Sequence, residues 1–322
     1  MAADGRGPVR VGLVLEQPSV RCSSNPFQCG AYLGLVRAQR KLRIQARAVA
    51  PSPTRANSYA PLFSSLARQH YNLVIAVGFL EIPALAQALR RFSDVKFGLL
   101  DANWSDAHRG RAPANLEGTV FHTEEASYLA GFVAARMADR GKPPHVISSV
   151  GGLKIPPVQS YIAGFEAGAK AADPKITLLR AYTDDFLSEP KCRHAALAQI
   201  ARGSQVVFNV AGTCGLGALK AAKQKGVYGL GVDIDQSNLG TYILTSVVKN
   251  LDVAVYDFAK RFVKGRLKMG GNLEFDLRNH GVGLGKFSPD VRPALRRKVK
   301  SLEALIEQGK IVVPTTPSSR QR

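Results

Sequence analysis

The sequence predicts an α/β protein built from two doubly wound, Rossmann-like lobes. The first observation is a regular alternation of apolar, strand-like segments with amphipathic helices, which is typical of a parallel sheet. The second is that this alternation starts twice, once near residue 9 and again after residue 117. The third is a length of 322 residues with 45% apolar content, which suits two domains with cores of ordinary size.

The first set of elements precedes a polar segment that we expect to be a loop, residues 102–117. Its apolar runs are continuous, as in strands buried on both faces of a sheet. We predict strands at 9–15, 43–50, 72–79 and 95–101, and helices at 30–42, 59–70 and 82–92.

The second set begins with a helix at Thr123, where Glu124 and Glu125 favour the helix dipole. Residues 205–250 then supply a strand, a glycine turn with a helix, a second strand and a third strand. We further predict strands at 145–152 and 176–182, helices at 158–172, 190–202 and 251–265, extended segments at 272–277 and 280–285, and a basic helix at 289–308.

The restart of the pattern sets the predicted domain bounds. We expect one lobe to comprise residues 8–121 with about 250–279, and the other 122–249 with about 280–312. Residues 313–322 form a polar segment that we expect to be a disordered tail.

The charge indicates an anionic neighbour. Forty-four basic and 24 acidic residues give a formal net charge of +20. The basic residues are dispersed, with no basic stretch interleaved with stacking aromatics, so we expect attraction to an anionic cell surface and no nucleic-acid binding. No apolar run is long enough to span a membrane. The N-terminus lacks the apolar core of a signal peptide, so the protein is cytosolic or its export signal lies outside this sequence.

Four cysteines fit two disulfides in an oxidising compartment. Cys22 and Cys29 bracket a short loop. Cys192 begins a helix and Cys214 lies in the glycine turn one βα unit later, so these two are close on one sheet edge, and their bond would add about 3 kcal/mol. Free buried thiols remain an alternative, as does a zinc site with His194, which lacks a clear fourth ligand.

The strand ends in 205–250 resemble one wall of a small-molecule site. Glycines there open a helix, and Asp233, Asp235 and Lys249 end strands. Ligands of open α/β sheets bind at this edge. The sequence has no dinucleotide fingerprint, P-loop or nucleophile elbow, and no acid/base pair at the strand ends. Acids, amides, aromatics and a lysine are groups that bind a polyhydroxylated ring, so we expect binding without catalysis, metal or cofactor.

Several motifs in one order resemble the basic membrane protein family: EASYLAG (125–131), VGG (150–152), GFEAG (164–168), GVDIDQ (231–236) and TSVVK (245–249). These are substrate-binding lipoproteins of ABC importers, related to the purine nucleoside receptor. The resemblance covers residues 9 to about 314. It implies a type I periplasmic-binding-protein fold with a hinge and an interlobe cleft. It also implies a monomeric, extracytoplasmic, membrane-anchored receptor that binds a nucleoside-like molecule and delivers it to a permease.

The resemblance also implies ligand contacts at the positions that match the family's motifs. Phe27 and Phe186 would stack on the base, and Gln28 would stand where the family has an asparagine. Asp101, Gly212, Asp233 and Lys249 would hold the rest of the ligand. Asp235 and Gln236 are expected to brace their loop. The segment RCSSNP replaces the family's acidic loop, and Cys29 stands where a glutamine is usual, so the base-binding end departs from the family pattern.

Ordinary structural roles compete with each of these assignments. The phenylalanines could be core residues, the aspartates could cap turns, and Lys249 could extend from a strand end into solvent. Two other functions also remain open. The same fold could be the ligand-sensing domain of a larger receptor or regulator, or a nucleoside-processing enzyme, which the absent acid/base pair disfavours.

Overall fold

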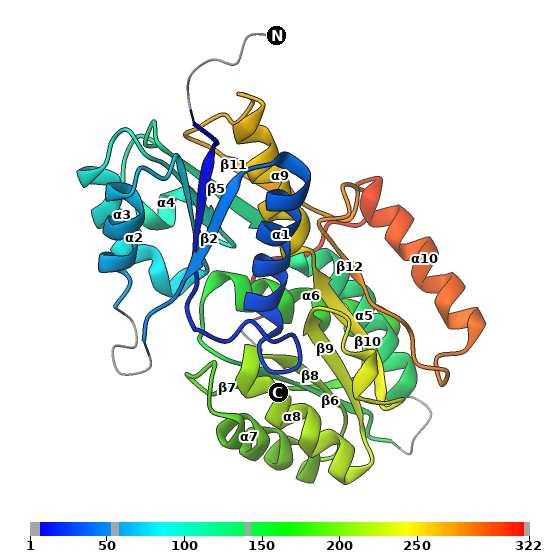
Figure 1. Cartoon of the computed structure of the whole chain (residues 1–322). Helices are drawn as coiled ribbons and strands as arrows, with labels where there is room; N and C mark the ends of the chain where they lie inside the picture. The colour runs from blue at the N-terminus through cyan, green and yellow to red at the C-terminus, as the bar shows by residue number, and fades with distance from the viewer. Residues whose placement is uncertain (1–6, 53–57, 139–142, 319–322) are drawn as a thin grey trace. The chain divides into compact units, whose positions relative to one another are not determined.

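The computed structural model describes residues 7–52, 58–138 and 143–318. The chain divides into two compact units (Figure 1). Unit 1 comprises Met1–Val120 and Leu251–Phe275, and unit 2 comprises Phe121–Asn250 and Asp276–Arg322. The chain therefore passes between the units three times.

Unit 1 is organised around a six-stranded sheet with the order β11-β5-β4-β3-β1-β2. The pairs from β2 through β5 are parallel. Because the register aligns Gly12 with Val74 and Val74 with Phe97, these three residues face the same side of the sheet. The strands are β1 (Arg10–Val14), β2 (Gln45–Val49), β3 (Leu73–Val77), β4 (Lys96–Leu100), β5 (Leu116–Phe121) and β11 (Asn272–Phe275).

Helices cover both faces of this sheet. α2 (Ala60–Arg68) places Leu66 against Gly12, whereas α9 (Leu251–Val263) places Phe258 against Gly98, on the opposite face. α3 (Ile82–Arg91) packs against α2, and α1 (Pro26–Leu42) packs against α9. Two short elements, η2 (Phe79–Glu81) and α4 (Trp104–Ala107), follow β3 and β4.

Unit 2 repeats the same arrangement. Its sheet order is β12-β10-β9-β8-β6-β7, and only the β10–β12 pair is antiparallel in the described ladders. The strands are β6 (Val146–Gly151), β7 (Thr177–Tyr182), β8 (Ser204–Val210), β9 (Tyr228–Asp233), β10 (Ile243–Lys249) and β12 (Val282–Leu284). A short 3-10 turn, η3 (Ser237–Leu239), joins β9 to β10.

Two helix pairs enclose this second sheet. On one face Phe165 of α6 (Pro156–Ala172) packs on Phe208, and α6 lies against α5 (Thr123–Ala138). On the other face Leu219 of α8 (Gly212–Lys225) approaches Gly229, and α8 packs against α7 (Glu189–Ala201). The α5–α6 approach requires glycine, because a Cβ at Gly168 would lie 1.8 Å from the backbone oxygen of Tyr128. α10 (Pro293–Glu307) packs against α5.

The predicted α/β class with two doubly wound sheets is confirmed, and two local predictions are wrong. Residues 102–117 are not a continuous loop: Asn103 and Asp106 form a capping box around α4, and β5 begins at Leu116. The polar composition of the segment hid both elements. α1 begins at Pro26, four residues before the prediction, because Asn25 caps it by accepting a hydrogen bond from the Gln28 N–H.

Part of the segment 313–322, which we expect to be a disordered tail, makes contacts with unit 2, although residues 314–316 and Ser318 are exposed. Val313 is buried, and Arg180 Nη2 donates a 3.1 Å hydrogen bond to the carbonyl oxygen of Ser318. Two contacts, one apolar and one polar, thus connect the start and the end of the described tail to unit 2. Residues 319–322 lie outside the described part of the chain.

Within the described residues, no helix combines the length and the apolar character needed to cross a membrane.

Candidate functional site

At the carboxyl edge of the unit 1 sheet, Glu16, Phe27 and Gly78 meet. A Cβ built on Gly78 would lie 2.4 Å from Glu16 Oε1 and 3.2 Å from Phe27 Cε1. Gly78 also has a φ of 105°, a conformation that L side chains rarely adopt. Because Gly78 has no side chain, the carboxyl group of Glu16 and the ring of Phe27 can both lie against it.

Gln28, predicted as a ligand contact, holds this acid in place. It is 1% exposed, and its Oε1 accepts a 3.1 Å hydrogen bond from the Glu16 N–H. Its Nε2 donates to Glu16 Oε2 at 3.5 Å. Gln28 thus orients the end of β1 from the first turn of α1.

Two aspartates at corresponding strand ends share an unusual backbone conformation. Asp101 follows β4 in unit 1 and has a φ of 66°, and Asp233 ends β9 in unit 2 with a φ of 67°. Asp is among the few L-residues that tolerate the left-handed region. The two units therefore present a carboxylate at an equivalent point, and backbone outliers of this kind cluster at binding sites.

In unit 2 the predicted Asp233 and Lys249 are joined through Tyr161. The Tyr161 hydroxyl donates a 3.1 Å hydrogen bond to Asp233 Oδ1. Lys249 Nζ lies 4.9 Å from the centroid of the Tyr161 ring and 5.6 Å from that of Phe121. Asp233 and Lys249 are 5% and 3% exposed. The arrangement holds a carboxylate and an ammonium group at adjacent strand ends.

Phe186 and Gly212, also predicted, are in contact in unit 2. A Cβ at Gly212 would lie 3.6 Å from the Phe186 carbonyl oxygen, and Gly212 has a φ of 54°. The Phe186 ring also covers Gly152, where a Cβ would lie 2.3 Å from the ring. Gly152 is therefore needed for the ring to fit at the end of β6, whereas at Gly212 it is the positive φ that favours glycine.

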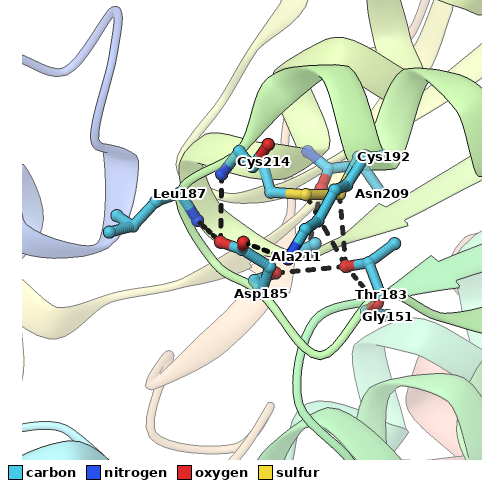
Figure 2. The surroundings of a disulfide bond; sticks show 10 residues. Gly151, Thr183, Asp185, Leu187, Cys192, Asn209, Ala211 and Cys214 are labelled. Carbon is cyan, nitrogen blue, oxygen red and sulfur yellow. Dashed lines mark hydrogen bonds and ion pairs between the residues drawn. A yellow bond between two sulfur atoms is a disulfide. The ribbon is translucent and has the colours of Figure 1, made fainter.

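The Cys192–Cys214 disulfide fixes the turn that carries Phe186 (Figure 2). The Thr183 hydroxyl oxygen lies 3.6 Å from each sulfur. Asp185 accepts hydrogen bonds from the backbone N–H groups of Leu187 and Ser188, at 2.7 and 3.0 Å. A hydrogen bond from Lys191 lowers the pKa of the Asp185 carboxyl to about 2, so it is ionised at neutral pH.

The second disulfide, Cys22–Cys29, joins the segment before α1 to the first turn of that helix, in which Phe27 and Gln28 lie. The Cα–Cα distances are 5.0 Å for this pair and 5.5 Å for Cys192–Cys214. The predicted use of all four cysteines in two disulfides is confirmed. Each of the two predicted aromatics therefore has a disulfide close to it in the chain.

The structure brings together Asp233 with Lys249 and Phe186 with Gly212 in unit 2. In unit 1, Phe27 and Gln28 are neighbours in the chain, and both lie close to Glu16. Sequence reasoning missed Glu16, Tyr161 and Phe121. Glu16 carried a usable signal, because it is an acid that directly follows an apolar strand, as Asp101 does. Tyr161 gave none, since one tyrosine on a helix does not reveal which strand end it faces. Asp235 and Gln236 brace their loop as expected, with Gln236 Oε1 accepting from the Val232 N–H at 2.9 Å.

The described residues contain no cluster of His, Cys, Asp and Glu suited to a metal ion. One groove of about 560 Å³ lies between α2 and α3 of unit 1, away from the strand ends. It contains none of the predicted ligand contacts and is lined by Ala60, Pro61, Ser64, Ser65, Arg68, Gln69, Ala84, Gln87, Ala88 and Arg91. What both units gather at their strand ends is carboxylates, aromatic rings and a lysine, which suit a ring-shaped polar solute.

Two doubly wound units with polar and aromatic groups at their strand ends define the class of solute-binding proteins. The family model described as "ABC transporter substrate-binding protein PnrA-like" matches residues 21–317. The chain therefore belongs to this family, Bmp. Basic membrane protein B of Borrelia garinii subsp. bavariensis is 30% identical over 263 residues, which are 80% of this chain and 74% of that protein. The CD4+ T-cell-stimulating antigen of Listeria monocytogenes is 28% identical over 276 residues, 80% of this chain and 74% of that protein.

Solved structures share the fold. An ABC transporter solute-binding protein from Aeropyrum pernix K1 aligns with a TM-score of 0.83 at 23% identity, covering 97% of this chain and 95% of that one. One from Agrobacterium vitis, bound with α-D-tagatopyranose, aligns with a TM-score of 0.65 at 16% identity, covering 90% and 98%. A transcriptional activator of the comK gene from Bacillus halodurans aligns with a TM-score of 0.76 at 23% identity, covering 93% and 98%. The predicted two-lobe periplasmic-binding-protein-like fold is confirmed.

Proposed function

We propose that the protein is the extracytoplasmic receptor of an ABC importer and binds a nucleoside-like solute without changing it chemically. The observation that carries the proposal is the unit 2 cluster of Asp233, Tyr161 and Lys249. A buried carboxylate beside a buried ammonium group offers both an acceptor and a donor to the hydroxyl groups of a sugar. Phe186, held across two glycines, offers a flat apolar face for a base.

Unit 1 contributes the remaining groups in this proposal. Phe27 supplies a second aromatic face, and Asp101 a second carboxylate at the equivalent strand end. Binding by both units implies hinge closure around the solute, followed by delivery to a membrane permease. We propose further that the receptor acts as a monomer held at the membrane, and that its net charge of +20 draws it to an anionic cell surface.

A ligand-sensing role is the second candidate, because the same fold occurs in the comK activator from Bacillus halodurans. Membership of the substrate-binding family favours transport. The deciding observation is the gene neighbourhood and the complete reading frame. Permease and ATPase genes beside it support the receptor, whereas a fused kinase or DNA-binding domain supports the sensor.

A thermal-shift screen of nucleosides, free bases and sugars tests the ligand class. A nucleoside at 100 times its dissociation constant should add about 2.7 kcal/mol of stability. The Asp233→Ala variant should fold yet show no shift. A sugar that stabilises the protein while every nucleoside fails would overturn the nucleoside assignment.

A further inference from the structure

The groove between α2 and α3 of unit 1 contains none of the residues of the proposed solute site. The two helices pack side by side (Figure 1). The groove has a volume of about 560 Å³, which is within the usual range for a small-molecule site. Ala84 and Ala88 are buried and line it together with Ala60 and Pro61. These short side chains leave the space between the helices open.

Two arginines line the groove, and each lies in the last turn of its helix. Arg68 ends α2 and Arg91 ends α3, and both residues are exposed. α2 leads into β3 and α3 leads into β4, and these strands are adjacent and parallel. Both helices therefore end at the amino edge of the sheet, which places the two arginines at one end of the groove. The proposed solute contacts of unit 1 lie at the opposite, carboxyl edge.

A chain of hydrogen bonds holds the polar wall of the groove. Arg47 of β2 donates from Nη1 to Gln69 Oε1 at 3.0 Å, and Gln69 Nε2 donates to Ser65 Oγ at 2.8 Å. Because the Ser65 oxygen already accepts a hydrogen bond, its hydroxyl proton is oriented for donation elsewhere. Ser64 supplies a second hydroxyl group to the lining. The wall thus adds hydroxyl donors to the two cations.

The residues that line the groove include no Asp or Glu. Glu81 is the only acid between residues 58 and 92, and it lies before α3, at the other end of that helix from Arg91. Basic residues in the last turn favour the helix dipole, and Arg40 and Lys41 do so in α1. The dipole accounts for arginines at helix ends. It does not account for a groove that combines them with hydroxyl donors and has no carboxylate.

The two guanidinium groups indicate the class of ligand. Each presents a planar fork of donors that matches two oxygens of an anion. A carboxylate has only two oxygens, whereas a phosphate group has three or more that two forks can share. The alanines of the floor offer an apolar surface to the organic part of such a ligand.

We propose that this groove is a second binding site, which takes the phosphate group of a phosphate ester. Arg68 and Arg91 hold the anion, and Ser65 donates a hydrogen bond to it. The ester is a soluble molecule or the headgroup of a membrane lipid, since both carry the same phosphate chemistry. The site is separate from the proposed solute site and does not depend on the solute's identity.

Calorimetric titration of the full chain with sn-glycerol 3-phosphate tests the site, with glycerol as the uncharged comparison. We expect one glycerol 3-phosphate to bind per chain and glycerol not to bind. Arg68→Gln/Arg91→Gln should weaken binding at least tenfold, because two charge-assisted contacts are lost. Wild-type affinity in this double variant would overturn the proposal.

Arg40→Gln/Lys41→Gln is the matched control. It removes the same charge from the last turn of α1, whose two basic residues are exposed and do not line the groove. This variant should bind glycerol 3-phosphate with wild-type affinity. An equal loss in both double variants would show attraction by net charge alone and would contradict a site in the groove.

Two further titrations test the ligand class and the location. Citrate carries its charge on carboxylates and should bind at least tenfold more weakly than glycerol 3-phosphate, so equal affinities would contradict the phosphate assignment. Saturating inosine should not displace glycerol 3-phosphate. Displacement would show that the anion occupies the solute site, and the proposal would fail.

Flotation with phosphatidylglycerol vesicles, compared with phosphatidylcholine vesicles, identifies the source of the ester. Binding of glycerol 3-phosphate supports a site for a soluble ester. Binding to phosphatidylglycerol vesicles alone, lost in Arg68→Gln/Arg91→Gln and kept in the α1 control, supports a site for a lipid headgroup. If neither probe binds in a manner that depends on Arg68 and Arg91, the groove is not a phosphate site.

Discussion

The backbone N–H of Cys214 donates a 2.9 Å hydrogen bond to the carbonyl oxygen of Phe186. Cys214 is also covalently joined to Cys192 at the start of α7. One residue thus links the first turns of two helices to the turn that carries an aromatic ring of the proposed site (Figure 2). We therefore expect the disulfide to help hold that ring in position.

Replacing Cys192 and Cys214 together by alanine should lower the free energy of unfolding by about 3 kcal/mol, because the unfolded chain loses a 22-residue constraint. Nucleoside affinity should fall as well, since the Phe186 turn loses its anchor. Denaturant unfolding and calorimetry measure the two effects separately.

The corresponding change at Cys22 and Cys29 is the control for the stability effect. Cys22 and Cys29 have a sequence separation of 7, so the loop-entropy model gives a smaller loss of unfolding free energy, about 2 kcal/mol. Unchanged stability in the Cys192–Cys214 variant, with the wild-type sulfurs shown to be bonded by thiol counting, would contradict the account.

Tyr161→Phe should separate the two contacts that Tyr161 makes. The change removes the hydrogen bond to Asp233 and keeps the ring beneath Lys249. We expect a loss of about 1 kcal/mol in stability, together with weaker nucleoside binding, but a smaller binding defect than in Asp233→Ala. Wild-type affinity in Tyr161→Phe would show that Asp233 is oriented by something else.

The buried pair of Arg180 and Glu166 should behave as one unit. Two 2.8 Å hydrogen bonds join the guanidinium to the carboxylate, and both side chains are largely buried. Arg180→Met leaves a buried acid alone and should cost about 3 to 5 kcal/mol.

Adding Glu166→Gln should recover much of that loss, because the charge is removed with its partner. Burial already raises the pKa of Glu166, against the opposing effect of Arg180. Urea denaturation of the two single variants and the double variant gives the coupling energy. Additive losses would rule out the paired arrangement.

Burial raises the pKa of the Glu16 carboxyl from 4.5 to about 8, so stability should fall as pH rises between these values. Over this range the unfolded chain releases the Glu16 proton while the folded protein keeps it, so the folded state binds more protons. Glu81 acts in the same direction. Glu16→Gln should therefore reduce the slope of unfolding free energy against pH without removing it. A slope unchanged in this variant would contradict the raised pKa of Glu16.

The fold could be predicted because its cues are local. Continuous apolar runs gave the buried strands, and their alternation with helices gave both sheets. The misses have local causes as well. The polar residues before Leu116 give no sign that β5 pairs with β4. The Asn25–Pro26 cap, at which α1 begins, lies before the apolar pattern that predicts this helix.

The site was harder to predict than the fold. Asp233 and Lys249 could be selected because each ends a strand, and Glu16 fits the same rule. Tyr161 could not be selected, because it reaches Asp233 from a helix 72 residues earlier in the chain. The raised pKa of Glu81 could not be predicted either, because it arises from complete burial and from the nearby Glu16, which comes from a distant part of the sequence.

Calorimetric titration of the wild-type protein with inosine, ribose and hypoxanthine tests the central claim most directly. We expect one nucleoside to bind per chain, with ribose and the free base each binding much more weakly, because a sugar-binding cluster and aromatic faces act together. Binding of ribose or another sugar as tight as that of the nucleoside, or no nucleoside binding at all, would contradict it.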